Sequence, residues 1–320
     1  MTIGIGLLCE GGGTAVLASD MRTTYGAAQV RHSDRGGKQY DFPPYLLAGA
    51  TAGKISISHA VISEFTECLH GLLKAKQEQP GRIIVLEHVM QCIDHARKKE
   101  LRKLQDCAVN AVIGAPLRFW LKGRTPDGPL GNSAFVNGLA ALRRVRDELR
   151  NDLGLIVLGW VDNSPVFLKA IGAEPLAESA SPPIYAIGSG RIAALNALNR
   201  REQDIEMTLA RSVLHVYEAL KAARKEKTVG PPDWYIVIRK DKMWRFNCEA
   251  PLLREWYRAY KKRPNTASLD TGLPNEQASR LLVEHGPRRR FRPSNHETLA
   301  SEPKPYGVRY PKTSPDASDD

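Results

Sequence analysis

The chain has 320 residues, of which 42% are hydrophobic and 25% charged, a balance typical of a globular protein with a sizeable core. Its 46 Lys and Arg residues exceed its 35 Asp and Glu residues, which gives a formal net charge of +11. That charge is too modest to indicate nucleic-acid binding by itself. No apolar run has the length of a membrane span, and the mean hydropathy is −0.35, so the sequence argues against a membrane protein.

The N-terminus and the cysteines indicate a cellular compartment. The first residues, MTIGIG, lack the basic segment, the long apolar stretch and the small-residue cleavage site of a signal peptide. The five cysteines are scattered and include no C-x-x-C pair, so free thiols are favoured over a disulfide scaffold. We therefore expect a cytoplasmic protein.

The composition of the chain changes towards the C-terminus. Nine of the 21 prolines lie between residues 251 and 320, where few apolar residues are present to offset the entropy of ordering. We expect one folded domain over residues 1–250, with an insertion near 105–150. A short helix at 251–263 and a disordered basic tail to residue 320 would follow it.

The predicted elements alternate between groups of strands and groups of helices. In chain order, the apolar patterns predict strands over 2–9, 14–19, 38–42 and 45–50, helices over 53–73, 82–104 and 135–150, strands over 153–161, 164–172 and 184–190, helices over 191–202 and 204–226, and a hairpin over 233–246. The segment EGGG and the pair Asp162-Asn163 are typical of tight turns. This order predicts an α+β fold with two antiparallel sheets and helix layers outside them.

Thr2 directly follows the initiator methionine, which is normally removed before a small residue. Removal would leave an α-amine and a hydroxyl on the same residue. An α-amine has a reference pKa of roughly 7.7–8.0, so it can act as a base near neutral pH. Because activation of a Thr hydroxyl by its own amine is a known arrangement, Thr2 is the candidate nucleophile.

Three further positions could support this chemistry. Asp20 ends one predicted strand and Lys38 begins another. A Lys beside Thr2 would disfavour protonation of the amine, and an Asp beside that Lys would keep it charged and oriented. Backbone N–H groups of a tight AGA turn at 48–50 could accept a developing oxyanion. The alternative readings are structural: a surface pair of Asp20 and Arg22, a solvated strand end at Lys38, and a simple strand-to-helix turn.

In this order, the segments resemble the N-terminal half of a proteasome β-subunit or of its bacterial HslV-type relative. The shared pattern is an initial Thr, a strand ending in A-x-D-x-R (18–22), a Lys that opens a later strand, and the turn AGATAG before a helix. IYAIGSG (184–190) is similar to the second signature of that family, and RKKELRKLQ (97–105) to the second helix of the HslV type. The resemblance covers residues 2–75 and about 153–247.

The resemblance implies an N-terminal-nucleophile (Ntn) hydrolase with a four-layer α-β-β-α sandwich. Carried over by position, Thr2 would be the nucleophile and, through its amine, the base. Asp20 and Lys38 would form the supporting ion pair. Gly49 would donate to the oxyanion, and Ser189 would bond the terminal amine. The resemblance further implies a threonine-type peptidase that acts on polypeptides without a metal or organic cofactor, a ring-shaped homo-oligomer and an unfolding ATPase as a partner.

One position departs from the proteasome pattern. Lys227 stands near the place where the supporting Asp of the proteasome would fall, although the HslV type also lacks that Asp. Two other functions stay open. One is an Ntn amidase or acyltransferase that acts on a small amide, and the other is a non-catalytic assembly or binding protein.

Two weaker signals point to ligands. Helical spacing could bring His88, Cys92 and His95 to one face as metal ligands, but packing or surface roles are more common for such residues. The basic runs KKR (261–263) and RRRFR (288–292) could contact nucleic acid, although a solvated basic segment is the usual outcome. We therefore expect no cofactor, no metal and no nucleic-acid partner.

Overall fold

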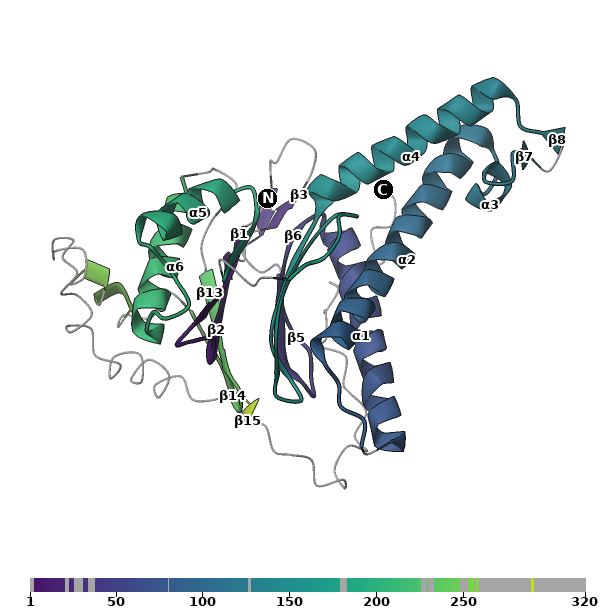
Figure 1. The fold of residues 1–320 in the computed structure, drawn as a ribbon. Coiled ribbons are helices and arrows are strands. Elements are labelled where there is room, and N and C mark those ends of the chain that lie inside the picture. The colour runs from purple at the N-terminus through teal and green to yellow at the C-terminus, as the bar shows by residue number, and fades with distance from the viewer. Residues whose placement is uncertain are drawn as a thin grey trace, which may run out of the picture. The chain divides into compact units, whose positions relative to one another are not determined.

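A computed structural model of the chain describes residues 3–20, 23–25, 31–33, 38–79, 81–125, 128–178, 183–225, 229, 233–247, 253–255, 257–258 and 289–290. All of these residues belong to one compact unit, Met1–Arg290. Its fold is mixed α/β and is built on two antiparallel sheets (Figure 1). Within the described ranges, no helix is both long enough and apolar enough to cross a membrane.

The larger sheet has six strands in the order β12-β1-β2-β13-β14-β15. Its strands are β1 (Ile3–Cys9), β2 (Thr14–Asp20), β12 (Ile184–Gly188), β13 (Asp233–Arg239), β14 (Lys242–Asn247) and β15 (Arg289–Arg290). β1 and β2 form the predicted hairpin. The turn between them includes Gly11 and Gly12, whose φ angles of 65° and 83° glycine adopts without steric cost.

The smaller sheet has five strands in the order β11-β10-β9-β6-β5. Its strands are β5 (Gln39–Asp41), β6 (Leu46–Gly53), β9 (Leu153–Val161), β10 (Ser164–Ile171) and β11 (Ala177–Glu178). β9 and β10 turn at Asp162 and Asn163, whose φ angles of 46° and 69° are those of a tight hairpin turn, as the sequence predicted. Two short ribbons pair β3 (Thr23–Tyr25) with β4 (Arg31–Ser33) and β7 (Arg124–Thr125) with β8 (Gly128–Pro129).

The two sheets pack against each other through an apolar cluster that includes Leu17, Ile156 and Phe167. Gly6 on β1 faces this cluster, and a Cβ atom at Gly6 would lie only 2.8 Å from Ile156 Cγ2. The missing side chain therefore allows the two sheets to approach closely at this point.

Helices cover the other face of each sheet (Figure 1). α1 (Ile55–Glu78) and α2 (Leu86–Ile113) pack on the five-stranded sheet, and α5 (Arg191–Arg200) and α6 (Leu209–Ala223) pack on the six-stranded sheet. Leu253 and Tyr257 also pack against α6, where Tyr257 lies edge-on to Tyr217 with ring centroids 4.8 Å apart. Each sheet is therefore sealed on the face that points away from its partner sheet.

Residues 98–150, here called the extension, project beyond the sheets (Figure 1). They comprise the end of α2, the short helix α3 (Leu117–Trp120), the β7-β8 ribbon and α4 (Asn132–Asp152) as far as residue 150. Trp120 is 7% exposed and stacks on Phe135 with ring centroids 5.1 Å apart. A Cβ atom at Gly138 would lie 2.2 Å from Trp120 Nε1, so α4 can pass over the indole only because residue 138 has no side chain.

For two of the predicted helices, local chemistry explains why their ends differ in the structure. The helix predicted over 82–104 runs instead over Leu86–Ile113 and stops at Gly114, whose φ of 68° is left-handed. The helix predicted over 204–226 begins only after Thr208, whose side chain caps the helix by accepting from the Arg211 N–H. The preceding segment stays non-helical because Asp204 Oδ1 accepts from the N–H groups of Glu206 and Met207.

The predicted tail falls largely outside the described residues. Of residues 259–320, only Arg289–Arg290 are described, and they pair with β14. The boundary at residue 250 and the disorder of the tail stay predictions.

Candidate active site

The start of β1 lies among the ends of three other strands. Ile3 pairs with Gly188 at the end of β12, and the hairpin register places Asp20, the last residue of β2, beside Ile3. Asp20 pairs in turn with Asp233 at the start of β13. The sheet thus brings four positions that are far apart in the sequence to one of its ends.

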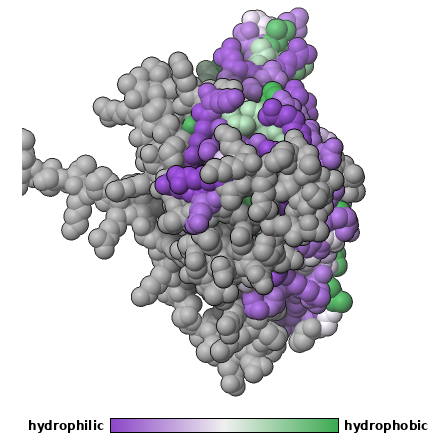
Figure 2. Space-filling view, turned by 90° about the vertical axis from the view of Figure 1, so that its left-hand side faces the viewer, coloured by the Kyte–Doolittle hydropathy of each residue, from purple (hydrophilic) through white to green (hydrophobic). Residues whose placement is uncertain are grey.

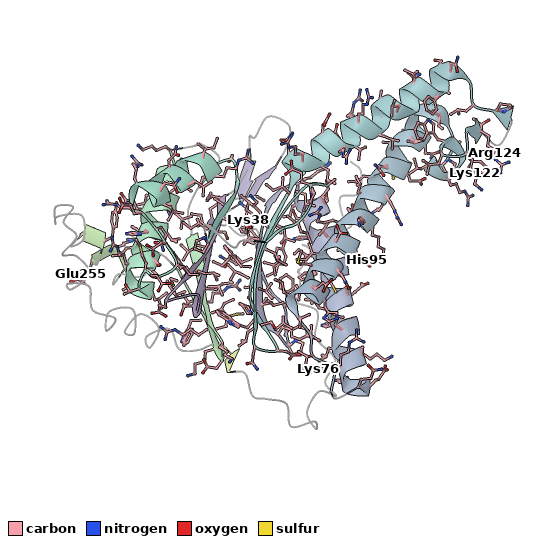
Figure 3. The ribbon with its side chains drawn as sticks, viewed as in Figure 1. Lys38, Lys76, His95, Lys122, Arg124 and Glu255 are labelled. Atoms are coloured by element: carbon pink, nitrogen blue, oxygen red, sulfur yellow. The ribbon has the colours of Figure 1, made fainter. Side chains whose placement is uncertain are left out.

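Asp20 and Lys38 form a buried ion pair at this end. Lys38 Nζ lies 3.2 Å from Asp20 Oδ1, and the two side chains are 8% and 0% exposed. The same Oδ1 accepts from the backbone N–H of Ile3 at 2.9 Å. Figure 3 shows Lys38 between the two sheets, so Lys38 is not a solvated strand end. Asp20 is not at the surface either, and Arg22 lies outside the described residues.

Further contacts hold the start of β5, which Lys38 directly precedes. The Thr51 N–H donates to the carbonyl oxygen of Lys38 at 2.9 Å. Gln39 joins the two sheets, because its Nε2 donates to the Trp234 carbonyl at 2.8 Å and its Oε1 accepts from Arg245 at 3.4 Å. The sequence analysis missed Gln39. The available signal was a polar residue at a strand position that alternation directs inward.

The catalytic roles predicted for Thr2 and Ser189 are not settled by the geometry of the ion pair. Thr2 lies outside the described residues, as does Lys227. Ser189 directly follows Gly188, the partner of Ile3, so it lies at the same end of the sheet, where its side chain is exposed. The catalytic roles of Thr2 and Ser189 stay predictions.

Gly49 lies in the middle of β6 rather than in a turn, so the prediction of a tight turn at 48–50 is wrong. The Phe42 N–H donates to the Leu47 carbonyl at 3.0 Å, and hydrogen-bonded pairs alternate along an antiparallel ladder. The pair Tyr40 and Gly49, two positions further on, is therefore of the hydrogen-bonded type. This register directs the Gly49 N–H to Tyr40 within the sheet, which argues against Gly49 as the oxyanion donor.

The strand-to-helix turn lies instead at Gly53. Its φ is 110°, and a Cβ atom there would lie 2.1 Å from the Asp152 carbonyl oxygen. The buried strand continues through Thr51 and Ala52, so only the backbone requirement at Gly53 marks its end.

His88, Cys92 and His95 do not share a site. His88 Nδ1 accepts from the Val85 N–H at 3.1 Å, Cys92 is buried between α1 and α2, and His95 Nε2 lies 3.2 Å from Glu64 Oε1. In the part of the chain that the structure describes, no three His, Cys, Asp or Glu side chains come together in a way that could hold a metal ion.

A second buried polar group, here called the neutral cluster, lies where α6 meets the loop after α5. His215 Nδ1 lies 2.8 Å from Gln203 Oε1, and Gln203 Nε2 donates to Ser212 Oγ at 3.0 Å. Burial, aided by the charges of Arg211 and Arg201, lowers the pKa of His215 to about 3. The imidazole is therefore uncharged near neutral pH, unlike the ion pair of Asp20 and Lys38.

Comparison with known proteins bears on the fold. No protein-family model matches the sequence, and no curated protein matches it. The chain shares its fold with Anbu. One similar structure is Anbu, described as an ancestral beta-subunit, from Yersinia bercovieri, with 12% identity, a TM-score of 0.53, and coverage of 85% of this chain and 98% of that chain. Another is a Gly-1 mutant of Anbu from Hyphomicrobium sp. strain MC1, with 14% identity, a TM-score of 0.52, and coverage of 83% and 99%.

These structures correct the family assignment. A second structure of Hyphomicrobium Anbu is also similar, with 14% identity, a TM-score of 0.51, and coverage of 83% of this chain and 99% of that chain. Anbu is proteasome-like but forms a distinct family, so the assignment to a proteasome β-subunit or HslV-type relative is wrong. The motifs that suggested it are short turns and strand ends, and these report a shared fold better than a family. At such identities the likeness shows the fold alone.

Proposed function

We propose that the chain is an Ntn hydrolase with the four-layer α-β-β-α arrangement and that Thr2, exposed by removal of Met1, is its nucleophile. The observation that carries the proposal is the buried contact of Asp20 Oδ1 with both Lys38 Nζ and the Ile3 N–H. Thr2 is covalently joined to Ile3, and consecutive Cα atoms lie about 3.8 Å apart, so a cation buried beside Ile3 is close to the amine that the mechanism needs.

The proposed reaction is hydrolysis of an amide bond. Thr2 Oγ attacks the carbonyl carbon while the α-amine takes the hydroxyl proton. The C–N bond breaks, the amine passes the proton to the leaving nitrogen, and an ester joins Thr2 to the acyl group. Water then attacks the ester with the same amine as base, and the proton returns to Thr2 Oγ as the acid leaves.

Lys38 has an electrostatic role in this proposal. Its positive charge disfavours protonation of a neighbouring amine, and Asp20 keeps the lysine charged and directed. Ser189 would bond the terminal amine. Polypeptide substrates, assembly of several copies into a ring and an ATPase partner belong to the same proposal. The fold shared with Anbu, described as an ancestral beta-subunit, supports the assembly of several copies.

Intact mass spectrometry with an electrophilic probe tests the proposal. The purified full chain should have lost Met1 and should gain one adduct from a peptide β-lactone. Thr2→Ala should gain none, whereas Thr66→Ala should react like the wild type because Thr66 lies on α1 and bonds the Ile62 carbonyl. Lys38→Met should react at least about a hundredfold more slowly, whereas Lys76→Met, which removes a lysine paired with Asp162, should not.

Retention of Met1, or an adduct that survives Thr2→Ala, would contradict the proposal and favour a non-catalytic assembly or binding protein. If Thr2 is labelled, turnover of casein and of small N-acyl amides should be compared. Cleavage of small amides alone would assign the chain to the amidase or acyltransferase alternative.

A further inference from the structure

The extension carries more than half of the net charge of the chain. Residues 98–150 hold eleven Lys or Arg residues and five Asp or Glu residues, a net charge of +6 out of +11. Some of these cations are paired, such as Lys98 with Asp94 and Arg150 with Glu174. Others are exposed and have no acidic partner among the described residues: Arg118, Lys122, Arg124, Arg143, Arg144 and Arg146.

The tip of the extension also exposes large apolar side chains. Val112 is 51% exposed, Leu121 67%, Phe135 47% and Val136 61%. They come from α2, from the residue after α3 and from α4, which meet at the tip around the buried Trp120. In Figure 2, hydrophobic residues appear among hydrophilic ones on the part that rises at the top of the view.

Defined contacts hold the elements of the tip together. Trp120 Nε1 donates to the Phe135 carbonyl at 3.3 Å, and the Leu117 N–H donates to Asp106 Oδ1 at 2.7 Å. These contacts fix α3 to α2 and α4, so the exposed side chains are held in place before any partner arrives. A preformed surface loses less conformational entropy on binding than a flexible one.

We infer that this tip, defined by Val112, Leu121, Lys122, Arg124, Phe135 and Val136, is a docking surface for an acidic polypeptide segment that also carries apolar side chains. The unpaired cations select acidic groups by charge complementarity. The apolar side chains supply contact area that only apolar groups of a partner can cover. Figure 3 shows Lys122 and Arg124 at the far end of the extension from Lys38, so the surface does not depend on the proposed hydrolase site.

Nucleic acid, an anionic membrane and a second copy of the chain each fit this surface less well than such a peptide. A nucleic-acid backbone would neutralise the cations but leave Leu121 and Val136 uncovered. An anionic membrane would be expected to meet exposed Trp or Tyr, whereas Trp120 at the tip is buried. A second copy that used the same tip would bring like charges together.

Fluorescence anisotropy with the full chain tests the inference. The probe is a short labelled peptide with equal numbers of Glu and Leu residues, compared at low salt with a poly-Glu peptide of the same length. The Glu/Leu peptide should bind more tightly. Lys122→Glu/Arg124→Glu and, separately, Leu121→Ser/Val136→Ser should each weaken its binding about tenfold. The control Lys74→Glu/Lys240→Glu makes the same change of charge at two exposed lysines away from the tip and should leave binding within about twofold.

Several outcomes would overturn the inference. They are absence of peptide binding, equal loss in the control variant, and tighter binding of oligothymidylate or of phosphatidylglycerol vesicles that depends on Lys122 and Arg124. Sedimentation would identify a second copy as the occupant if a dimer dissociated in both tip variants. Circular dichroism of each variant should match the wild type, so that loss of binding is not loss of folding.

Discussion

The ion pair of Asp20 and Lys38 and the neutral cluster around His215 are both buried and polar, but they are built differently. In the neutral cluster, an uncharged imidazole, an amide and a hydroxyl satisfy one another beneath α6. In the ion pair, two opposite charges meet where four strand ends converge, and the carboxylate of Asp20 also accepts from the backbone N–H of Ile3. The comparison shows that burial of polar groups does not by itself mark a site. A buried ion pair beside the start of the chain is the stronger candidate, because perturbed charges cluster at functional sites.

The largest expected effect comes from removing one charge of the ion pair. Lys38→Met should lower the free energy of unfolding by about 3–5 kcal/mol, because it removes a positive charge that lies 3.2 Å from the buried Asp20 carboxylate. Urea denaturation measures this. The double variant Asp20→Asn/Lys38→Met should recover much of the loss, since it removes both charges of the pair.

Lys76 provides the matched control for that experiment. Its pair with Asp162 is partly exposed, with side-chain exposures of 33% and 17%, so Lys76→Met should cost about 1 kcal/mol or less. If Lys38→Met lowered the free energy of unfolding no more than Lys76→Met, the buried ion pair would contribute no more to stability than the partly exposed one.

The second expected effect is a pH dependence of the stability that comes from His215 in the neutral cluster. Burial lowers the pKa of His215 from its ordinary 6.5 to about 3. Between these values the unfolded chain binds a proton at His215 that the folded chain does not, so this contribution to stability is lost as the pH falls. Between pH 7 and 4.5 the loss should be roughly 2–3 kcal/mol.

Urea denaturation of the wild type and of His215→Asn at several pH values measures this contribution. The variant lacks the titrating group, so the difference in stability between the two proteins should shrink as the pH falls. A difference that stays constant over this range would show that His215 protonates equally in the folded and unfolded states.

The smallest effect concerns one hydrogen bond of the neutral cluster. Ser212→Ala removes the oxygen that accepts from Gln203 Nε2, which keeps the Asp204 carbonyl as a second acceptor. Thermal unfolding should show a loss of about 0.5–1.5 kcal/mol. Ser133→Ala, at an exposed position on α4, should change the stability by less than about 0.5 kcal/mol. Equal effects of the two substitutions would mean that the cluster adds nothing to stability.

Much of the fold could be predicted because its strands end in recognisable turns. Asp162-Asn163 and the glycines after Cys9 mark hairpins by backbone chemistry that acts locally. The lengths of α2 and α6 could not be predicted from apolar spacing. The end of α2 depends on Gly114, and the start of α6 depends on side-chain bonds of Asp204 and Thr208.

The candidate site could be predicted in part. Asp20 and Lys38 could be proposed as neighbours because both stand at strand ends, and the structure brings them together. The direction of the Gly49 amide could not be predicted, since it follows from the register of β5 against β6. The partners of Gln39 could not be predicted either, because they lie on β13 and β14, about two hundred residues away along the chain.

The bond between Ile3 and Asp20 has a consequence for dynamics. Amides at the beginning of a chain usually fray and exchange their hydrogens with solvent rapidly. The Ile3 amide instead donates to a carboxylate that is fully shielded from water. Slow deuterium uptake at this single position would therefore report directly on the integrity of the charged pair, without any substrate or inhibitor.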